Sequence, residues 1–209
     1  MGRRIKEDPN VHKNRIADQA EKLFVGMGIE RTSMDDIARA AEYSKATLYV
    51  YFKNKEDIVS FLALRSMSGL KAVILEVLQK EMNCRETFLG ICFALVDYHR
   101  NFPAFFDRSL EFISIDFDEK QDDYLGQTYQ VGEEINAMIT GFIESGVQNN
   151  EIRECTNYFV LIFQMWGMIS GLIKLAGEKE EYVTRKSGLT KQVFLRDGFE
   201  QIFNGILKK

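Results

Sequence analysis

The sequence predicts an all-α protein, and three observations support this fold class. Apolar residues recur at spacings of three and four along most of the chain, which is the period of an amphipathic helix. Only two prolines occur among the 209 residues, and the glycines are spread singly. No stretch alternates apolar and polar residues over the length of a β-strand. We therefore expect about nine helices, arranged as a three-helix N-terminal domain and a larger helical domain after it.

The composition is that of a globular protein with a substantial core, since 45% of the residues are apolar and 28% are charged. The formal charge of −4 argues at first against a nucleic-acid partner. However, residues 1–60 carry 11 Lys/Arg and 10 Asp/Glu, so the excess of acid lies in the remainder. A basic face can exist on a domain that is nearly neutral.

Cysteine usage and the N-terminus predict a cytoplasmic protein. The three cysteines, Cys84, Cys92 and Cys155, form no CxxC pair and have no histidine at metal-ligand spacing. Their odd number suggests free, buried thiols in a reducing compartment. The N-terminus is charged and has no apolar run, so we expect no signal peptide.

The most informative stretch is residues 32–57, which reads as two short helices followed by a third. Ser33 is a favourable N-cap residue, and Asp36, three positions later, completes a capping box. The second helix begins at another N-cap residue, Ser44, and runs over residues 44–51. Two short helices joined by a tight turn match a helix-turn-helix, whose second helix enters the major groove of DNA.

The composition of the second helix favours this interpretation over a helical hairpin whose polar residues are merely solvated. No acid occurs between Ser44 and Lys55, and donors and cations without acids suit a phosphate surface. We expect base-edge contacts from Lys45, Thr47 and Tyr49. We expect phosphate contacts from Ser33, Tyr51, Lys53 and Lys55. The full set of expected DNA-binding residues is Ser33, Ser44, Lys45, Ala46, Thr47, Tyr49, Tyr51, Lys53 and Lys55.

The run TSMDDIA followed by SKATLYVYFKNKED resembles the DNA-binding signature of TetR-type transcriptional regulators over about residues 12–60. The resemblance implies a homodimeric repressor that binds a palindromic operator in double-stranded DNA and responds to a small-molecule effector. It also implies a DNA-binding domain over residues 1–55 and an effector-binding and dimerisation domain over residues 56–209. One departure is Glu42, where the family usually has glycine in the turn. If this position is left-handed, Glu42 costs about 1–2 kcal/mol of backbone strain.

The elements that flank the helix-turn-helix are also predictable. Residues 1–12 read as a basic arm, which we expect to be disordered with occasional phosphate contact; minor-groove binding is the alternative. A first helix over residues 13–27 should end at Gly28 and pack on the helix-turn-helix. A long helix should run from Lys55 to about Met82, with Asn54 as its N-cap. Such a helix would touch both domains and would couple them.

The rest of the chain reads as amphipathic helices with one acidic segment. Residues 116–123 lack the glycine and terminal glutamate of a calcium loop, so we expect a solvated loop there. The expected helices are 84–101, a shorter one after Pro103, 124–148, 156–176 and 189–207.

Residues 156–176 are the most apolar stretch and are long enough to span a bilayer. Gln164 and Lys174 interrupt the stretch, and no second span is evident, so we interpret it as the centre of a dimer instead. The resemblance implies that the last two helices pair with their symmetry mates in a four-helix bundle. The expected interface residues are Gly167, Ser170, Gly171, Phe199, Ile202 and Phe203.

The interior is rich in aromatic residues and methionine, with 16 Phe, 8 Tyr, 8 Met and 1 Trp. Most of these residues can simply fill a core, but helix bundles also place ligand sites between helices. The resemblance implies an effector site there, and the composition predicts a largely apolar or aromatic effector. The candidate polar anchors are His99, Asn136 and Gln164. The expected lining residues are Phe88, Cys92, His99, Phe105, Phe106, Phe112, Tyr129, Met138, Phe142, Phe163, Gln164 and Trp166.

No catalytic motif is apparent. His12 and His99 are the only histidines, and the sequence has no nucleophile elbow, phosphate-binding glycine loop or paired metal ligands. We therefore expect no enzyme activity, metal or cofactor. Two alternatives to a repressor are a ligand-responsive activator and, more remotely, a helical ligand-binding or enzymatic protein with a vestigial DNA-binding domain.

Overall fold

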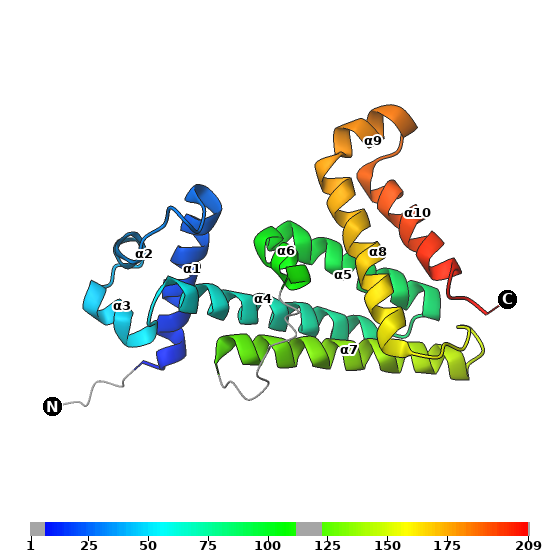
Figure 1. Cartoon of the computed structure of the whole chain (residues 1–209), viewed down its shortest axis with the longest axis horizontal. Helices are drawn as coiled ribbons and strands as arrows, with labels where there is room; N and C mark the ends of the chain where they lie inside the picture. The colour runs from blue at the N-terminus through cyan, green and yellow to red at the C-terminus, as the bar shows by residue number, and fades with distance from the viewer. Residues whose placement is uncertain (1–6, 112–122, 209) are drawn as a thin grey trace. The chain divides into compact units, whose positions relative to one another are not determined.

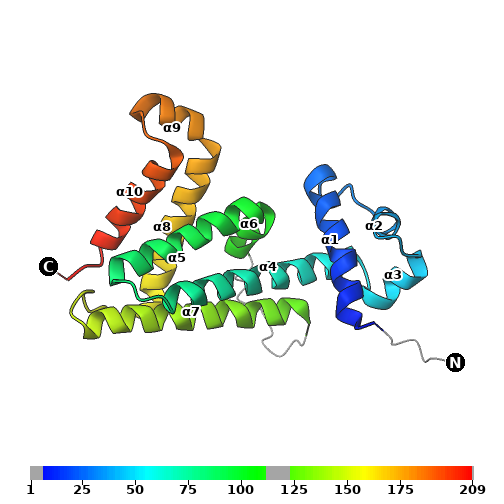
Figure 2. The ribbon, with the colours of Figure 1, turned by 180° about the vertical axis from the view of Figure 1, so that it is seen from behind.

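A computed structural model describes residues 7–111 and 123–208, and in these ranges the chain forms ten α-helices (Figure 1; seen from behind in Figure 2). The described ranges contain no β-structure except one isolated antiparallel bridge between Ile152 and Leu207. The all-α prediction is thus confirmed. The helices are α1 (Pro9–Met27), α2 (Met34–Ala40), α3 (Lys45–Tyr51), α4 (Lys55–Leu78), α5 (Cys84–Asn101), α6 (Pro103–Glu111), α7 (Tyr124–Gln148), α8 (Tyr158–Glu178), α9 (Glu180–Ser187) and α10 (Lys191–Asn204).

The predicted N-caps begin the helices of the N-terminal region. The Ser33 hydroxyl accepts a hydrogen bond from the Asp36 amide, and the Asp36 carboxylate accepts one from the Ser33 amide, which completes the capping box. The Ser44 hydroxyl accepts from the Thr47 amide at 3.0 Å at the start of α3. At the start of α4, Asn54 Oδ1 accepts from the Asp57 amide at 2.8 Å. These bonds satisfy amides that have no partner within the helices.

Several boundaries differ from the predictions. Helix α1 begins at Pro9 instead of residue 13, because Asp8 caps it and proline suits the first helical turn. The long helix α4 ends at Leu78, four residues short of Met82. Helix α9 was not predicted at all. It buries none of its residues and therefore leaves no apolar period in the sequence.

Some predictions lie outside the described residues. These are the basic arm up to residue 6, the candidate lining residue Phe112, and the acidic segment up to residue 122. Within the described part of the expected arm, Pro9 to His12 are helical, which corrects the expectation of disorder for these residues.

The chain divides into two compact units, and α4 passes from one to the other between Arg65 and Ser66. In the described residues, the first unit contains α1, α2, α3, the beginning of α4 and residues 123–128. Its core consists of fully buried apolar side chains from these helices. The core residues are Ile16, Ala17, Ala20, Ile37, Leu48, Phe52, Ile58 and Leu62. On the surface of this unit, the guanidinium of Arg65 on α4 lies 2.6 Å from the Asp18 carboxylate and 2.9 Å from the Glu21 carboxylate, both on α1.

The second unit contains the rest of α4 and α7 together with α5, α6, α8, α9 and α10. Helix α10 packs on α8 and α5. Gly198 on α10 permits this close packing, because a Cβ atom there would collide with the Leu172 side chain of α8. The buried residues of α8, which include Ile162, Ile169 and Ile173, form one side of the core.

Helices α4 and α8 are each long and apolar enough to cross a membrane, judged by length and composition alone, so the expectation that no second such stretch exists is wrong. The core helix of a globular protein passes the same test. In α8, one side is buried in the second unit, whereas Phe159, Met168 and Leu175 on the helix are exposed.

Glu42, in the turn between α2 and α3, has a φ of 61°, so the left-handed conformation considered for this position is present. We expect Glu42→Gly to raise the opening free energy of the α2 and α3 amides by about 1 kcal/mol, because glycine removes the Cβ strain. Native-state hydrogen exchange measures this quantity. Glu42→Ala is the matched control and should give no such gain, since alanine keeps the Cβ atom. Equal increases in opening free energy for both variants would show that strain from the Cβ atom at this position is not the cause.

Candidate nucleic-acid interface and effector site

Helix α3 buries one residue and presents most of the others to solvent. Leu48 is fully buried, whereas Lys45, Ala46, Tyr49 and Val50 are exposed. The exposed fraction is 45% for Tyr49 and 77% for Val50. The structure thus brings three predicted DNA-binding residues, Lys45, Ala46 and Tyr49, to one exposed surface. Val50 is a fourth residue there that the sequence analysis did not single out.

The predicted hydroxyl donors act in the helix caps. The Ser44 and Thr47 hydroxyls lie 2.7 Å apart, and Ser44 also caps α3. The Ser33 hydroxyl donates to Asp36 Oδ2, and this bond, together with that from the Ser33 amide, lowers the pKa of Asp36. Ser33 and Ser44 remain exposed, so they orient the helices and still face solvent.

The three predicted cations have different surroundings. Lys45 Nζ lies 2.9 Å from Asp35 Oδ1, and the hydrogen bond to Asp35 raises the pKa of Lys45. The absence of acids along α3 is therefore partly offset by an acid from α2. Lys53 is exposed. Lys55 is half-buried and donates to the backbone carbonyl of Ile29 at 2.8 Å. This hydrogen bond joins the start of α4 to the segment between α1 and α2.

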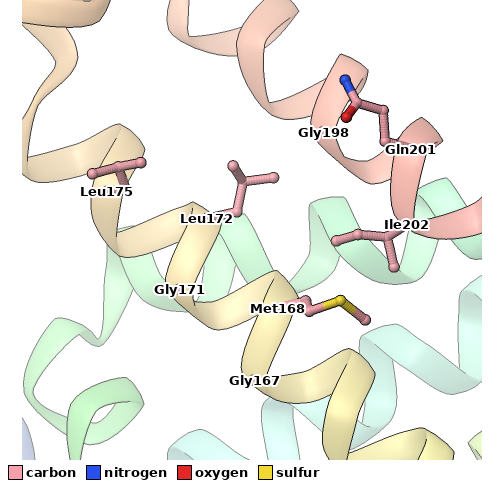
Figure 3. A pocket seen from close by; sticks show the side chains of 8 residues that line it. All are labelled: Gly167, Met168, Gly171, Leu172, Leu175, Gly198, Gln201 and Ile202. Carbon is pink, nitrogen blue, oxygen red and sulfur yellow. The ribbon is translucent and has the colours of Figure 1, made fainter.

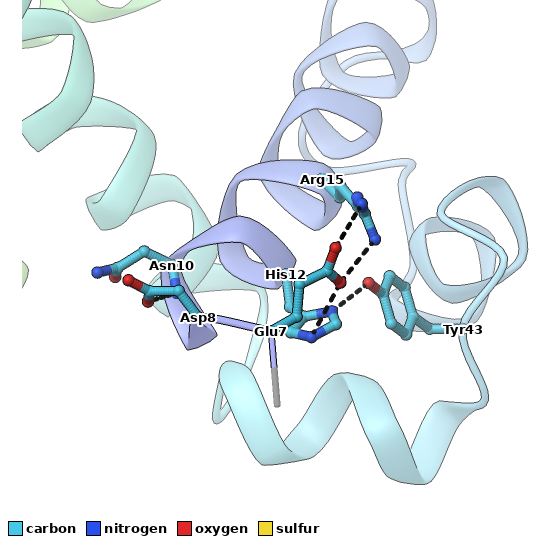
Figure 4. Close-up of polar contacts among 6 residues, drawn as sticks. All are labelled: Glu7, Asp8, Asn10, His12, Arg15 and Tyr43. Carbon is cyan, nitrogen blue, oxygen red and sulfur yellow. Dashed lines mark hydrogen bonds and ion pairs between the residues drawn. The ribbon is translucent and has the colours of Figure 1, made fainter. Parts of the chain in front are cut away.

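An aromatic cluster links the start of α1 to both ends of α3, and its polar contacts are drawn in Figure 4. His12 Nδ1 lies 2.6 Å from the Tyr43 hydroxyl, and the His12 ring stacks on Tyr51 with centroids 5.2 Å apart. Glu7 accepts two hydrogen bonds from Arg15, at 3.0 and 3.1 Å, and lies 3.5 Å from His12 Nε2. The cluster holds Tyr51, a predicted phosphate contact, in place. Sequence spacing could not reveal it, because His12 and Tyr43 are 31 positions apart.

Of the predicted effector-site residues, the structure brings three together from α5, α6 and α8. The Phe106 ring lies 4.8 Å from His99 and 5.8 Å from Trp166, measured between centroids. Tyr98, which was not predicted, also lies beside Phe106, at 6.2 Å, and its hydroxyl is 3.2 Å from that of Ser66. Burial lowers the pKa of His99, which favours the neutral imidazole.

The other predicted lining residues are dispersed in the second unit. Phe88 packs on Phe203 of α10 at 5.1 Å, and Phe163 packs on Phe159 at 4.4 Å. Phe105 and Cys92 are buried, and burial raises the pKa of the Cys92 thiol. The remaining ones lie on the surface or half-buried: Tyr129, Asn136, Met138, Phe142 and Gln164.

An open groove of about 570 Å³ lies between α8 and α10 (Figure 3). Three predicted interface residues, Gly167, Gly171 and Ile202, line it; the other lining residues are Met168, Leu172, Leu175, Gly198 and Gln201.

The other three predicted interface residues require correction. Ser170, Phe199 and Phe203 are almost fully buried within the single chain, so their side chains face its own core. The Ser170 hydroxyl donates to the Trp166 carbonyl at 2.7 Å.

In the described ranges, no three His, Cys, Asp or Glu side chains are grouped so that they could hold a metal ion. The three cysteines are free; Cys84 and Cys155 are half-buried, so only Cys92 matches the expectation of a buried thiol. Burial also raises the pKa of Cys84 to about 11, which disfavours a reactive thiolate.

The arrangement of α2 and α3 is that of a helix-turn-helix, and comparison with known proteins shows which family this region resembles. Residues 16–60 match the model described as "Bacterial regulatory proteins, tetR family". This part of the chain is therefore similar to the DNA-binding region of TetR-family transcriptional regulators.

Individual relatives are distant. The chain is 24% identical to the uncharacterised HTH-type transcriptional regulator YhgD of Bacillus subtilis, over 68% of this chain and 73% of that protein. It is 41% identical to IcaR of Staphylococcus epidermidis, described as a negative transcriptional regulator of the biofilm operon, over 22% and 25% of the two chains. Among solved structures, FadR of Bacillus subtilis in complex with stearoyl-CoA has a TM-score of 0.69 at 18% identity, over 92% of this chain and 98% of that one.

The different surroundings of Lys53 and Lys55 give a testable contrast. Lys55→Met removes a charged donor to a backbone carbonyl, so we expect the free energy of unfolding of the first unit to fall by about 1–3 kcal/mol. Lys53→Met should leave this free energy unchanged but reduce the salt dependence of DNA binding by about one unit of slope. Urea denaturation and binding at several salt concentrations measure the two effects. Equal stability losses in both variants would contradict the assignment.

Proposed function

We propose that this protein is a cytoplasmic, homodimeric repressor that binds a palindromic operator and is released by a small, largely apolar or aromatic effector. The observation that carries the proposal is the exposed surface of α3, where Lys45, Ala46 and Tyr49 face solvent. Such a surface suits the major groove, with Lys45, Thr47 and Tyr49 at base edges. Ser33, Tyr51 and Lys53 are suited to phosphate. The Lys55 ammonium already donates one hydrogen bond to the Ile29 carbonyl, so a phosphate contact would use another of its N–H groups.

The groove between α8 and α10 supports the dimer. Met168 and Leu175 are 50% and 47% exposed, so this apolar surface is incompletely covered by its own subunit. Gly167 and Gly171 have open space where a Cβ atom would lie, which permits a partner helix to approach closely. We propose that a second copy of the chain covers this surface. Two α3 helices would then read two half-sites one helical turn, or a multiple of it, apart.

The effector proposal rests on the aromatic cluster of His99, Phe106 and Trp166. Its ring faces and neutral imidazole suit a ligand that is mainly apolar with one polar group. A protein of similar fold, FadR, was solved with stearoyl-CoA, so long-chain acyl-CoA is a suitable first ligand to test. The description of IcaR as a negative regulator supports repression over activation.

Helix α4 is the proposed coupling element. It begins at Lys55, four residues after α3 ends, and continues without a break to Leu78 in the second unit. A tilt of α4 on effector binding would change the separation of the two α3 helices in the dimer. A coupling free energy of about 1–3 kcal/mol would lower operator affinity by about 5–150-fold.

The DNA-binding proposal is tested by selecting bound sequences from a random duplex library. We expect the wild-type chain to enrich a palindrome, because each subunit reads the same half-site. The control is Lys45→Ala/Lys53→Ala, which changes only exposed side chains and should fold but not enrich the palindrome. Failure of a folded wild-type dimer to enrich any sequence would contradict the proposal.

The effector proposal is tested with Trp166, the only tryptophan in the chain. Titration with long-chain acyl-CoA should change Trp166 emission and lower operator affinity about 5–150-fold, and operator should weaken effector binding by the same factor. Phe163→Ala provides a variant near the predicted site that keeps the fluorophore. Unchanged operator affinity at saturating ligand would exclude acyl-CoA as the effector, and unchanged ligand affinity in Phe163→Ala would exclude Phe163 from the site.

A further inference from the structure

We propose that Val50 is a specificity-determining residue that contacts the C5-methyl group of a thymine in the operator half-site. The inference rests on the proposed function, since it assumes that α3 enters the major groove. It begins from an apolar side chain on the exposed surface of α3. Val50 is 77% exposed on α3, whereas Leu48, two positions earlier, is fully buried. Nothing in the first unit's own packing accounts for a branched apolar side chain at this position.

The exposed residues of α3 form two adjacent strips. Residues four apart lie on the same side of a helix, one turn above the other. Lys45 and Tyr49 therefore form a strip of hydrogen-bonding groups, and Ala46 and Val50 form an apolar strip beside it. The two strips have the same length and all four residues are exposed, so a groove that contacts the first strip also contacts the second.

The chemistry of the major groove determines what an apolar strip can recognise. The base edges there offer hydrogen-bond donors and acceptors and a single apolar group, the C5-methyl of thymine. Valine can form no hydrogen bond, and it would leave any donor or acceptor opposite it without a partner. A thymine methyl is thus the group that Val50 fits. A phosphate is not, because phosphate oxygens require donors or cations.

Helix geometry also limits where a second methyl contact can fall. Ala46 and Val50 are separated by about 6 Å along the helix axis, from a rise of 1.5 Å per residue. Base pairs in DNA are stacked about 3.4 Å apart. If Ala46 contacts a second thymine, that base lies within about two base pairs of the first.

The strip is held in a defined orientation. Ser44 caps the start of α3, the Tyr51 ring at its end stacks on His12, and Leu48 is buried beneath it. Substitution of Val50 should leave this framework intact, because the side chain is exposed and alanine is a better helix former than valine.

The test uses the palindrome obtained by library selection and replaces each thymine of one half-site, one at a time, by deoxyuridine. This change removes only the C5-methyl group. At the position opposite Val50 we expect wild-type affinity to fall about fourfold, as for the loss of one buried methyl group. Val50→Ala should bind the thymine duplex several-fold more weakly and lose its sensitivity to deoxyuridine at that position alone. Val25→Ala is the matched control, since Val25 is 82% exposed on α1 outside the helix-turn-helix, and should behave as wild type.

Each result has a distinct meaning. Insensitivity of the wild-type chain to deoxyuridine at every thymine would overturn the inference, and so would Val50→Ala retaining the wild-type sensitivity at every position. A Val50→Ala variant that loses affinity equally for all duplexes would assign Val50 to a sequence-independent contact instead. Failure of the proposed function would be seen earlier and separately, because the wild-type chain would then enrich no palindrome at all.

Discussion

The burial of Leu48 is the contact on which the DNA-binding surface depends. A helix of seven residues is not stable by itself in water, so α3 must be held by its neighbours. Leu48 and Phe52, the residue directly after the end of α3, anchor the helix to the core, and both are almost completely buried. Because Leu48 faces the core formed with Ile16 and Ile37, the strips formed by Lys45 and Tyr49 and by Ala46 and Val50 must face away from it. Burial on one side of α3 thus defines the surface on the other.

The local features of this region were predictable from the sequence because they depend on residues that are close together. The N-caps at Ser33, Ser44 and Asn54 each act over three positions, and all three are present. Contacts between distant residues were not predictable. The stacking of His12 on Tyr51, the ion pair of Lys45 with Asp35 and the bond from Lys55 to the Ile29 carbonyl require the folded arrangement of several helices.

The second unit shows a different limit to sequence-based prediction. Helix α8 is apolar on nearly all sides, so its sequence has no clear period from which to decide which side is buried. For this reason Ser170 was assigned to an interface although it lies in the core, whereas Gly167 and Gly171 do line the exposed groove. The aromatic content likewise predicted an effector site, but only folding brings His99, Phe106 and Trp166 together.

The central claim is that operator DNA covers the exposed surface of α3. Lysine acetylation of the free and operator-bound chain, read by mass spectrometry, tests it directly. Lys45 and Lys53 should become much less reactive when operator is bound, whereas Lys80 and Lys179, which are exposed in the second unit, should not change. Unchanged reactivity of Lys45 and Lys53 in the complex, or protection of Lys80 and Lys179 alone, would contradict the account.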